Sequence, residues 1–214
     1  MRYKYVLFDL DGTLTDSGKG IMNSARYAFG ELGLETPPTQ ELRKMIGPPL
    51  GVSFAFLGVP QEQVEEAIRL YRDRYNNHGG KYECEIYPGI VELLEKLQAG
   101  GCRLYVATSK PEAMARDILT KFELARYFEY IAGATFDHSR EGKAAVLRYL
   151  LELTGETNDS VLIGDTHYDV LGANELGIPC IGVTWGYGTR DEMQAAGAAE
   201  IVDSPDALYE YLRG

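Results

Sequence analysis

Short apolar runs that alternate with helical patterns are the feature that most constrains the fold of this chain. Five runs rich in β-branched and aromatic residues have the length of buried strands. They are residues 5–8, 103–107, 130–132, 161–163 and 180–183. Between them, apolar residues recur at spacings of three and four, which places them on one face of a helix. The alternation predicts an α/β fold, a Rossmann-like doubly wound parallel sheet with helices on both faces.

Residues 17–81 interrupt this alternation, because they hold helical patterns and no convincing strand. The two apolar stripes are Ile21, Ala25, Ala28, Phe29 and Leu32, then Val64, Ala67, Ile68, Tyr71 and Tyr75. Residues 76–81 and 87–89 carry the Gly, Pro and Asn that form loops. We expect a core of residues 1–16 and 82–214 with an inserted α-helical cap of residues 17–81. Spacing alone equally allows these helices to belong to one continuous fold.

Composition narrows the class of protein. The 214 residues are 45% hydrophobic and 25% charged, as in an ordinary soluble globular chain. The net charge of −11 is spread along the sequence, which argues against general binding to nucleic acid or membrane surfaces. No apolar segment reaches the roughly 20 residues of a membrane span, and the first run is too short for a secretory signal. We therefore expect a cytoplasmic protein. Its three cysteines lack paired spacing, which favours free thiols over disulfides or zinc.

Two carboxylates follow the first predicted strand, in the segment Phe8-Asp9-Leu10-Asp11-Gly12-Thr13. Ligands bind at the carboxyl ends of parallel strands, so Asp9 and Asp11 are candidate site residues. A lone D-x-D is a weak signal, because Asp and Gly also form solvated turns.

A second acidic segment, Gly164-Asp165-Thr166-His167-Tyr168-Asp169, follows the strand predicted at 161–163. A helix that starts soon after Gly164 would bring Asp165 and Asp169 to one ligand. Converging carboxylates repel unless a cation holds them, and oxygen ligands suit Mg²⁺. The segment thus predicts a magnesium site, although helix capping would explain Asp165 without one.

Two further segments offer groups for an anion. Thr108 and Ser109 directly follow the strand predicted at 103–107. Hydroxyls and backbone N–H groups at a helix start can bind phosphoryl oxygens there. Lys143 lies in the first turn of a predicted helix, where the helix dipole disfavours a cation unless an anion accompanies it. Helix capping and solvation would account for these residues equally well.

Taken in order, D-x-D-G-T, then T-S-K, then a downstream Lys, then G-D-T-x-x-D resembles the four motifs of the haloacid dehalogenase superfamily. The resemblance spans Asp9 to Asp169. It implies a Rossmann-like core, and a helical cap between the first two motifs is similar to that of the family's phosphoglycolate phosphatases and bacterial 5′-nucleotidases. The implied activity is Mg²⁺-dependent hydrolysis of a small phosphomonoester metabolite, of the phosphoglycolate or nucleoside 5′-monophosphate type.

The resemblance also implies residue roles. Asp9 becomes the nucleophile that forms an aspartyl-phosphate, and Asp11 the acid and base. Asp9 and Asp165 would bind Mg²⁺ with the backbone carbonyl of Asp11. Asp169 would support the metal directly, through water, or by orienting Lys143. Thr108, Ser109 and Lys143 would bind the transferring phosphoryl group.

Asp11 also separates activities within the family, because dehalogenases have no acid at this position and need no leaving-group protonation. A phosphonoacetaldehyde hydrolase would need a cap lysine, and nothing around Lys19 or Lys44 favours one. A β-phosphoglucomutase-like mutase shares the core motifs and remains an alternative.

The cap and one core loop hold the candidates for substrate specificity. The Gly47-Pro48-Pro49 turn is rigid and would place backbone near a substrate, or would simply connect two helices. Arg140 would bind a carboxylate or phosphate, or be solvated. Trp185 follows the last core strand, where packing is the simpler role.

Two non-enzymatic readings complete the alternatives. A phosphate-accepting receiver module would place its acceptor on a middle strand of a shorter chain, whereas Asp9 follows the first strand. A catalytically silent binding protein would be expected to lose an acid, yet Asp9, Asp11 and Asp165 are all present. We expect a monomer or homodimer with a small phosphorylated metabolite as its partner.

Overall fold

A computed structural model describes residues 1–137, 139–155 and 159–214. The chain forms two compact units, one of Met1–Thr15 with Ile86–Gly214 and the other of Asp16–Glu85. It passes from the first unit to the second within β2 (Thr15–Asp16) and returns within β3 (Glu85–Ile86). These two short strands pair with each other.

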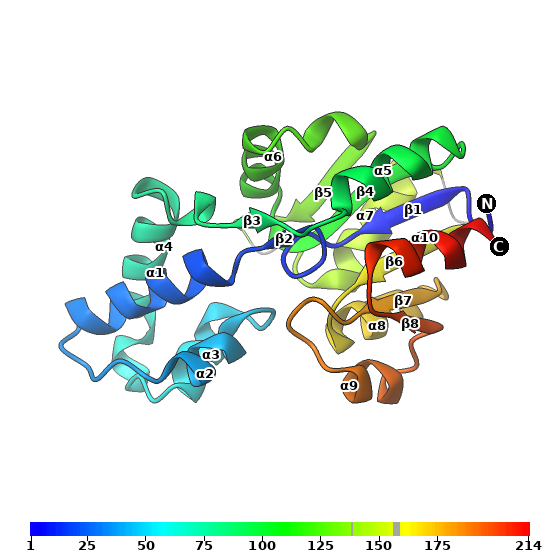
Figure 1. The fold of residues 1–214 in the computed structure, drawn as a ribbon. Coiled ribbons are helices and arrows are strands. Elements are labelled where there is room, and N and C mark those ends of the chain that lie inside the picture. Colours follow the sequence, from blue (N-terminus) through cyan, green and yellow to red (C-terminus); the bar gives the residue numbers. More distant parts are fainter. Residues whose placement is uncertain (138, 156–158) are drawn as a thin grey trace. The chain divides into compact units, whose positions relative to one another are not determined.

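The first unit is built on a six-stranded parallel sheet of order β5-β4-β1-β6-β7-β8 (Figure 1). Its strands are β1 (Tyr5–Phe8), β4 (Arg103–Pro111), β5 (Tyr130–Ala134), β6 (Ser160–Gly164), β7 (Cys180–Val183) and β8 (Glu200–Val202). The predicted doubly wound α/β core is confirmed, with all five expected strands present. Strand β8 was not predicted, because it has only three residues, lies at the sheet edge and buries only Val202.

Helices cover both faces of this sheet because successive strand side chains point to opposite sides. In β1, Val6 and Phe8 join one apolar cluster, while Tyr5 and Leu7 join the other. The first face carries α5 (Ile90–Ala99), α6 (Glu112–Lys121) and α10 (Pro205–Arg213). The second carries α7 (Lys143–Thr154), α8 (His167–Asn174) and α9 (Arg190–Ala195). A 3₁₀ turn, η4 (Ala125–Tyr127), precedes β5.

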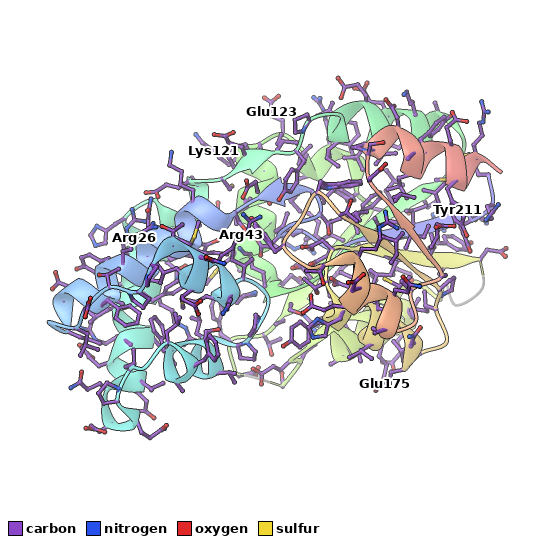
Figure 2. The ribbon with its side chains drawn as sticks, turned by 60° about the horizontal axis from the view of Figure 1, so that its bottom comes forward. Arg26, Arg43, Lys121, Glu123, Glu175 and Tyr211 are labelled. Atoms are coloured by element: carbon purple, nitrogen blue, oxygen red, sulfur yellow. The ribbon has the colours of Figure 1, made fainter. Side chains whose placement is uncertain are left out.

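The second unit is helical. It contains α1 (Gly18–Glu31), α2 (Thr39–Leu42), η1 (Arg43–Met45), α3 (Leu50–Phe56), η2 (Gln61–Gln63), α4 (Val64–Asn77) and η3 (Gly80–Tyr82). Buried aromatic rings contact one another inside this unit. The centroid of the Phe54 ring lies 6.0 Å from that of Phe29 and 6.1 Å from that of Tyr71. Arg26 of α1, labelled in Figure 2, donates to the Thr39 hydroxyl and so ties α2 to α1.

The chain ends lie together in the first unit. The Arg2 amide donates to the Leu212 carbonyl over 2.7 Å. The Arg2 guanidinium lies 4.1 Å from the centre of the ring of Tyr211, a residue labelled in Figure 2. All three cysteines are buried, and the structure shows no disulfide between them. Among the described helices, none combines the length and apolar character needed to cross a bilayer.

Candidate active site

Four of the predicted site residues of the core, Asp9, Lys143, Asp165 and Asp169, lie together beyond the ends of β1 and β6. Strand β1 lies between β4 and β6. The sheet therefore extends from β1 in two directions, through β4 to β5 on one side and through β6 to β7 and β8 on the other. Asp9 directly follows β1, and its amide donates to the Ile163 carbonyl of β6 over 2.9 Å. Asp165 directly follows β6. Parallel strands that end at one edge thus bring together acids that are 156 positions apart in the sequence.

Lys143, the first residue of α7, joins the acidic groups to one another. Its ammonium nitrogen lies 2.7 Å from Asp9 Oδ1 and 2.8 Å from Asp169 Oδ1. It also donates to the Ala107 carbonyl of β4 over 2.7 Å. This lysine is only 6% exposed, so its charge is satisfied by protein groups and not by bulk water.

The charges of this cluster shift its pKa values in opposite directions. Burial by itself lowers the pKa of Lys143, but the negative charges of Asp169 and Asp9 outweigh it and raise that pKa above its ordinary value. Burial raises the pKa of Asp9 to about 6, although Lys143 acts to lower it. Burial, followed by the charges of Asp169 and Asp9, raises the pKa of Asp165 strongly. Lys143 therefore stays protonated. Its single positive charge does not balance the negative charges of the three acids around it.

Asp165 is fully buried and rigidly held. Its Oδ1 accepts from the Thr13 hydroxyl over 3.1 Å and its Oδ2 from the Tyr187 amide over 2.9 Å. Gly12 has φ +90°, and a Cβ added there would overlap the Asp165 carboxylate. The glycine of the D-x-D-G-T segment is therefore required by conformation and by space.

Asp169 is engaged at both oxygens. Its Oδ1 contacts Lys143, and its Oδ2 accepts from the Thr166 amide and hydroxyl over 3.0 and 2.8 Å. The Thr166 contacts form a capping box at the start of α8. Arg148 of α7 pairs with Glu175 beyond α8 (labelled in Figure 2), which adds a second tie between these helices.

The donor set fits a hard divalent cation. One carboxylate oxygen from each of Asp9, Asp165 and Asp169 lies within 4.8 Å of the other two. Three carboxylates facing one ammonium leave two negative charges to neutralise. The pKa values of Asp9 and Asp165 are raised chiefly by burial and further by the neighbouring acids. All-oxygen donors of this kind suit Mg²⁺ or a similar ion.

Asp11 is paired with a residue that the sequence interpretation did not single out. The Lys110 ammonium lies 2.9 Å from Asp11 Oδ1 and 2.8 Å from Oδ2. The Lys110 side chain is 7% exposed and that of Asp11 19% exposed. Lys110 is the last residue of the T-S-K segment. Its place in that motif could be seen in the sequence, but its contact with Asp11 could not.

The remaining candidates have separate places. Thr108 is buried in β4 and its hydroxyl accepts from the Lys110 amide over 3.2 Å, whereas Ser109 is exposed. Gly47 and Pro48 belong to the second unit, between η1 and α3, and their role in specificity stays a prediction. The Trp185 indole donates to the Thr13 carbonyl over 3.0 Å and packs against the apolar core. This agrees with the packing role expected from the sequence.

Arg140 is bound by the protein itself. Its guanidinium donates to the Gly133 carbonyl over 2.7 Å and to Glu112 over 2.8 Å, and it lies 3.7 Å from the centre of the Tyr149 ring. These contacts join the end of β5 to α6 and α7. Binding of substrate by Arg140 stays a prediction.

Comparison with known proteins matches the chain to one family over most of its length. The model of the haloacid dehalogenase-like hydrolases matches residues 6–183. A Pseudomonas aeruginosa protein named 5′-nucleotidase is 42% identical over 197 residues, which cover 91% of this chain and 89% of that protein.

Two other proteins similar to this chain carry different names. A solved structure described as a predicted phosphatase from Clostridium acetobutylicum is 42% identical, with a TM-score of 0.91 over 99% of this chain and 98% of that one. The Mycobacterium tuberculosis protein named tyrosine-protein kinase PtkA is 42% identical over 187 residues, 87% of this chain but 64% of that protein.

Proposed function

This chain belongs to the haloacid dehalogenase-like hydrolases and is a phosphatase of that family, and on this premise we propose that it hydrolyses a small phosphomonoester with Mg²⁺ through an aspartyl-phosphate on Asp9. The observation that supports the proposal most directly is the position of Asp9. Its carboxylate contacts buried Lys143 and lies within a cluster suited to a divalent cation. In this proposal the nucleophile, a buried ammonium and the metal ligands therefore lie together at the carboxyl ends of the strands.

The first half of the reaction transfers the phosphoryl group to Asp9. A carboxylate oxygen attacks phosphorus in line, and the bond from phosphorus to the leaving oxygen breaks. Asp11 donates a proton to that oxygen, which departs as an alcohol. Lys143 neutralises charge on the phosphoryl oxygens. The Thr108 hydroxyl accepts from the Lys110 amide, so its own proton can be donated to a phosphoryl oxygen.

The second half regenerates Asp9. Asp11, now ionised, takes a proton from water, and the hydroxide attacks phosphorus so that the bond to Asp9 breaks and inorganic phosphate leaves. Asp9 and Asp165 would hold Mg²⁺, which when bound neutralises charge between the acids and the phosphate dianion. Asp169, engaged by Lys143 and Thr166, serves in this proposal to orient Lys143. Such positioning and charge neutralisation supply most of the catalysis of phosphoryl transfer.

The substrate is proposed from the relatives and from the helical second unit. A nucleoside 5′-monophosphate is the first candidate, because the Pseudomonas aeruginosa relative is named a 5′-nucleotidase over nearly its whole length. Phosphoglycolate is the second, from the family resemblance of the cap. We propose that residues 17–81 act as the cap and that Gly47 and Pro48 contribute to its selectivity.

Turnover of p-nitrophenyl phosphate with Mg²⁺ tests the chemistry. The wild-type protein should release p-nitrophenol, chelation with EDTA should stop it, and Asp9→Asn should be inactive. A phosphate-dependent mass increase on the peptide containing Asp9, trapped by rapid acid quench, would identify the intermediate. An active Asp9→Asn variant would refute the nucleophile.

A metabolite screen scored by kcat/KM then selects the substrate. It should include nucleoside 5′-monophosphates, phosphoglycolate, sugar phosphates and pyrophosphate. Because a β-phosphoglucomutase-like enzyme would share the same core residues, products from a hexose bisphosphate should be examined for isomerisation. An isomerised sugar phosphate in place of free phosphate would favour the mutase.

A further inference from the structure

The contact between Lys110 and Asp11 has a geometry beyond that of an ordinary surface ion pair. The ammonium reaches both carboxylate oxygens, at 2.9 and 2.8 Å, and 7% of its side chain is exposed. Exposed pairs contribute little because two flexible side chains must be ordered in water. Here both groups are largely shielded, so the contact restricts where the Asp11 carboxylate can lie.

A bulge in β4 places Lys110 at this position. Thr108 pairs with Gly133 of β5, but the next pair joins Pro111 to Ala134, so two residues of β4 are left over against none of β5. Bulges redirect side chains at strand ends and are common beside active sites. The two extra residues are Ser109 and Lys110, and the Lys110 amide donates to the Thr108 hydroxyl, which closes the bulge on itself.

The neighbouring strand fixes the bulge from the other side. A Cβ added to Gly133 would lie 2.5 Å from the Lys110 carbonyl oxygen and 2.6 Å from the Glu112 backbone, so only glycine permits this close approach. The Gly133 carbonyl accepts from Arg140, which also donates to Glu112. Arg140 and Glu112 thus brace the turn that carries Lys110.

We propose that Lys110 is a positioning residue that holds the Asp11 carboxylate in line with the leaving oxygen, and that the bulge braced by Gly133, Arg140 and Glu112 sets its position. The proposal rests on the acid–base role proposed for Asp11. Because Lys110 contacts both oxygens, one can stay bonded to the ammonium while the other carries or releases the transferred proton. Lys110 keeps its own proton throughout and acts only through the Asp11 carboxylate, without contacting the phosphoryl group or the leaving oxygen in this proposal.

The leaving group distinguishes this role from a merely structural one. Phenolate is a poorer leaving group than p-nitrophenolate and depends more on protonation by Asp11. Lys110→Met should therefore lower kcat/KM for phenyl phosphate by about 10- to 100-fold, which is less than the roughly 10²- to 10⁴-fold contributed by a general acid, because Asp11 itself remains. It should lower kcat/KM for p-nitrophenyl phosphate several-fold less. Asp11→Asn should show the same selectivity to a larger degree.

The second half-reaction supplies an independent measurement. Misplaced Asp11 activates water poorly, so Lys110→Met should accumulate the aspartyl-phosphate. A burst of p-nitrophenol approaching one equivalent of enzyme is expected in stopped flow. Lys110→Arg, which keeps the cation, should restore most of the phenyl phosphate activity and abolish the burst.

A matched variant controls for loss of a lysine. Lys96 forms an exposed pair with Asp206 at 3.1 Å on the same unit, and Lys96→Met should leave both esters unaffected. Equal losses for the two esters in Lys110→Met, or no loss, would overturn the positioning role. Full activity of Asp9→Asn would instead refute the proposed function, and absence of leaving-group selectivity in Asp11→Asn would refute the acid–base role itself. If Lys110→Met is unstable, Lys110→Gln with the same two esters decides the question.

Discussion

The ammonium of Lys143 lies 2.7 Å from the carboxylate of Asp9, and both groups are removed from bulk water. Lys143→Met should therefore affect catalysis and stability together. Loss of one preorganised charge for the phosphoryl group should lower kcat/KM for p-nitrophenyl phosphate by about 10²- to 10³-fold. Breaking a buried pair from one side typically costs about 3–5 kcal/mol. Steady-state kinetics and urea unfolding measure the two effects.

The control for this variant is Lys96→Met, because its ion pair is exposed. It should change the free energy of unfolding by less than about 1 kcal/mol. Activity of Lys143→Met within about threefold of wild type would contradict the role proposed for Lys143. Removal of a preorganised charge that stabilises the transition state lowers the rate far more than threefold.

Asp165 and Asp169 offer a matched pair of buried acids with different contacts. Asp165→Asn should weaken Mg²⁺ binding severely, because the residue proposed as a direct ligand loses its charge. Asp169→Asn should instead lower kcat by about 10- to 100-fold with a smaller change in Mg²⁺ affinity, as expected for a residue that orients another. Isothermal titration calorimetry and kinetics separate the cases. Equal loss of Mg²⁺ affinity in the two variants would show that Asp169 binds the ion directly.

The raised pKa of Asp9 predicts how the metal-free protein responds to pH. An ordinary Asp titrates near 3.8, whereas Asp9 titrates at about 6 in the folded state. Between these values the folded chain binds more protons than the unfolded chain, so the free energy of unfolding falls as pH rises through this window. The contribution of Asp9 is on the order of 2 to 3 kcal/mol.

Asp9→Asn supplies the reference for that measurement, because its amide does not titrate. The difference in unfolding free energy between Asp9→Asn and wild type, both in EDTA, should grow from pH 4 to pH 6.5. Saturating Mg²⁺ should reduce the difference above pH 6 by stabilising the ionised cluster. A difference independent of pH would contradict the raised pKa of Asp9.

Gly12 can be tested against a glycine that shares its backbone conformation but not its neighbour. Gly12 has φ +90° and lies against the Asp165 carboxylate, whereas Gly101 has φ +85° and no atom within 4 Å of an added Cβ. Both alanine variants should lose about 1 kcal/mol or more from backbone strain. Only Gly12→Ala should also lose Mg²⁺ affinity and activity. Similar activity in the two variants would show that Asp165 tolerates displacement.

The core fold was predictable because its signals are local. Strand β1 begins and ends where its four apolar residues do, and β7 likewise matches its predicted run. Strand β8 escaped prediction because it begins with Glu200, which leaves an apolar run of only two residues paired with β7. Helix α8 also lacked a clear signal, because its start is set by the Thr166–Asp169 capping box inside an acidic segment that also serves the site.

The gathering of acids followed from strand order, but the pairings between side chains did not. That Lys143 contacts both Asp9 and Asp169 depends on where α7 begins relative to two strands and α8. Lys110 could be read in the T-S-K segment, yet its contact with Asp11 requires a bulge whose register is set by β5. Arg140 illustrates the same limit, since its place beside Glu112 depends on a separate helix.

The hydrogen bond between Arg2 and Leu212 has a practical consequence for engineering. Both ends of the chain meet beside the start of β1, the strand whose far end leads to Asp9 (Figure 1). A short peptide linker should therefore join them without disturbing catalysis, and new ends could be opened at the exposed Gly100–Gly101 turn after α5. Fusion partners attached at the new ends would lie at the edge of the sheet where the parallel strands β1 and β4 begin, whereas Asp9 follows the other end of β1.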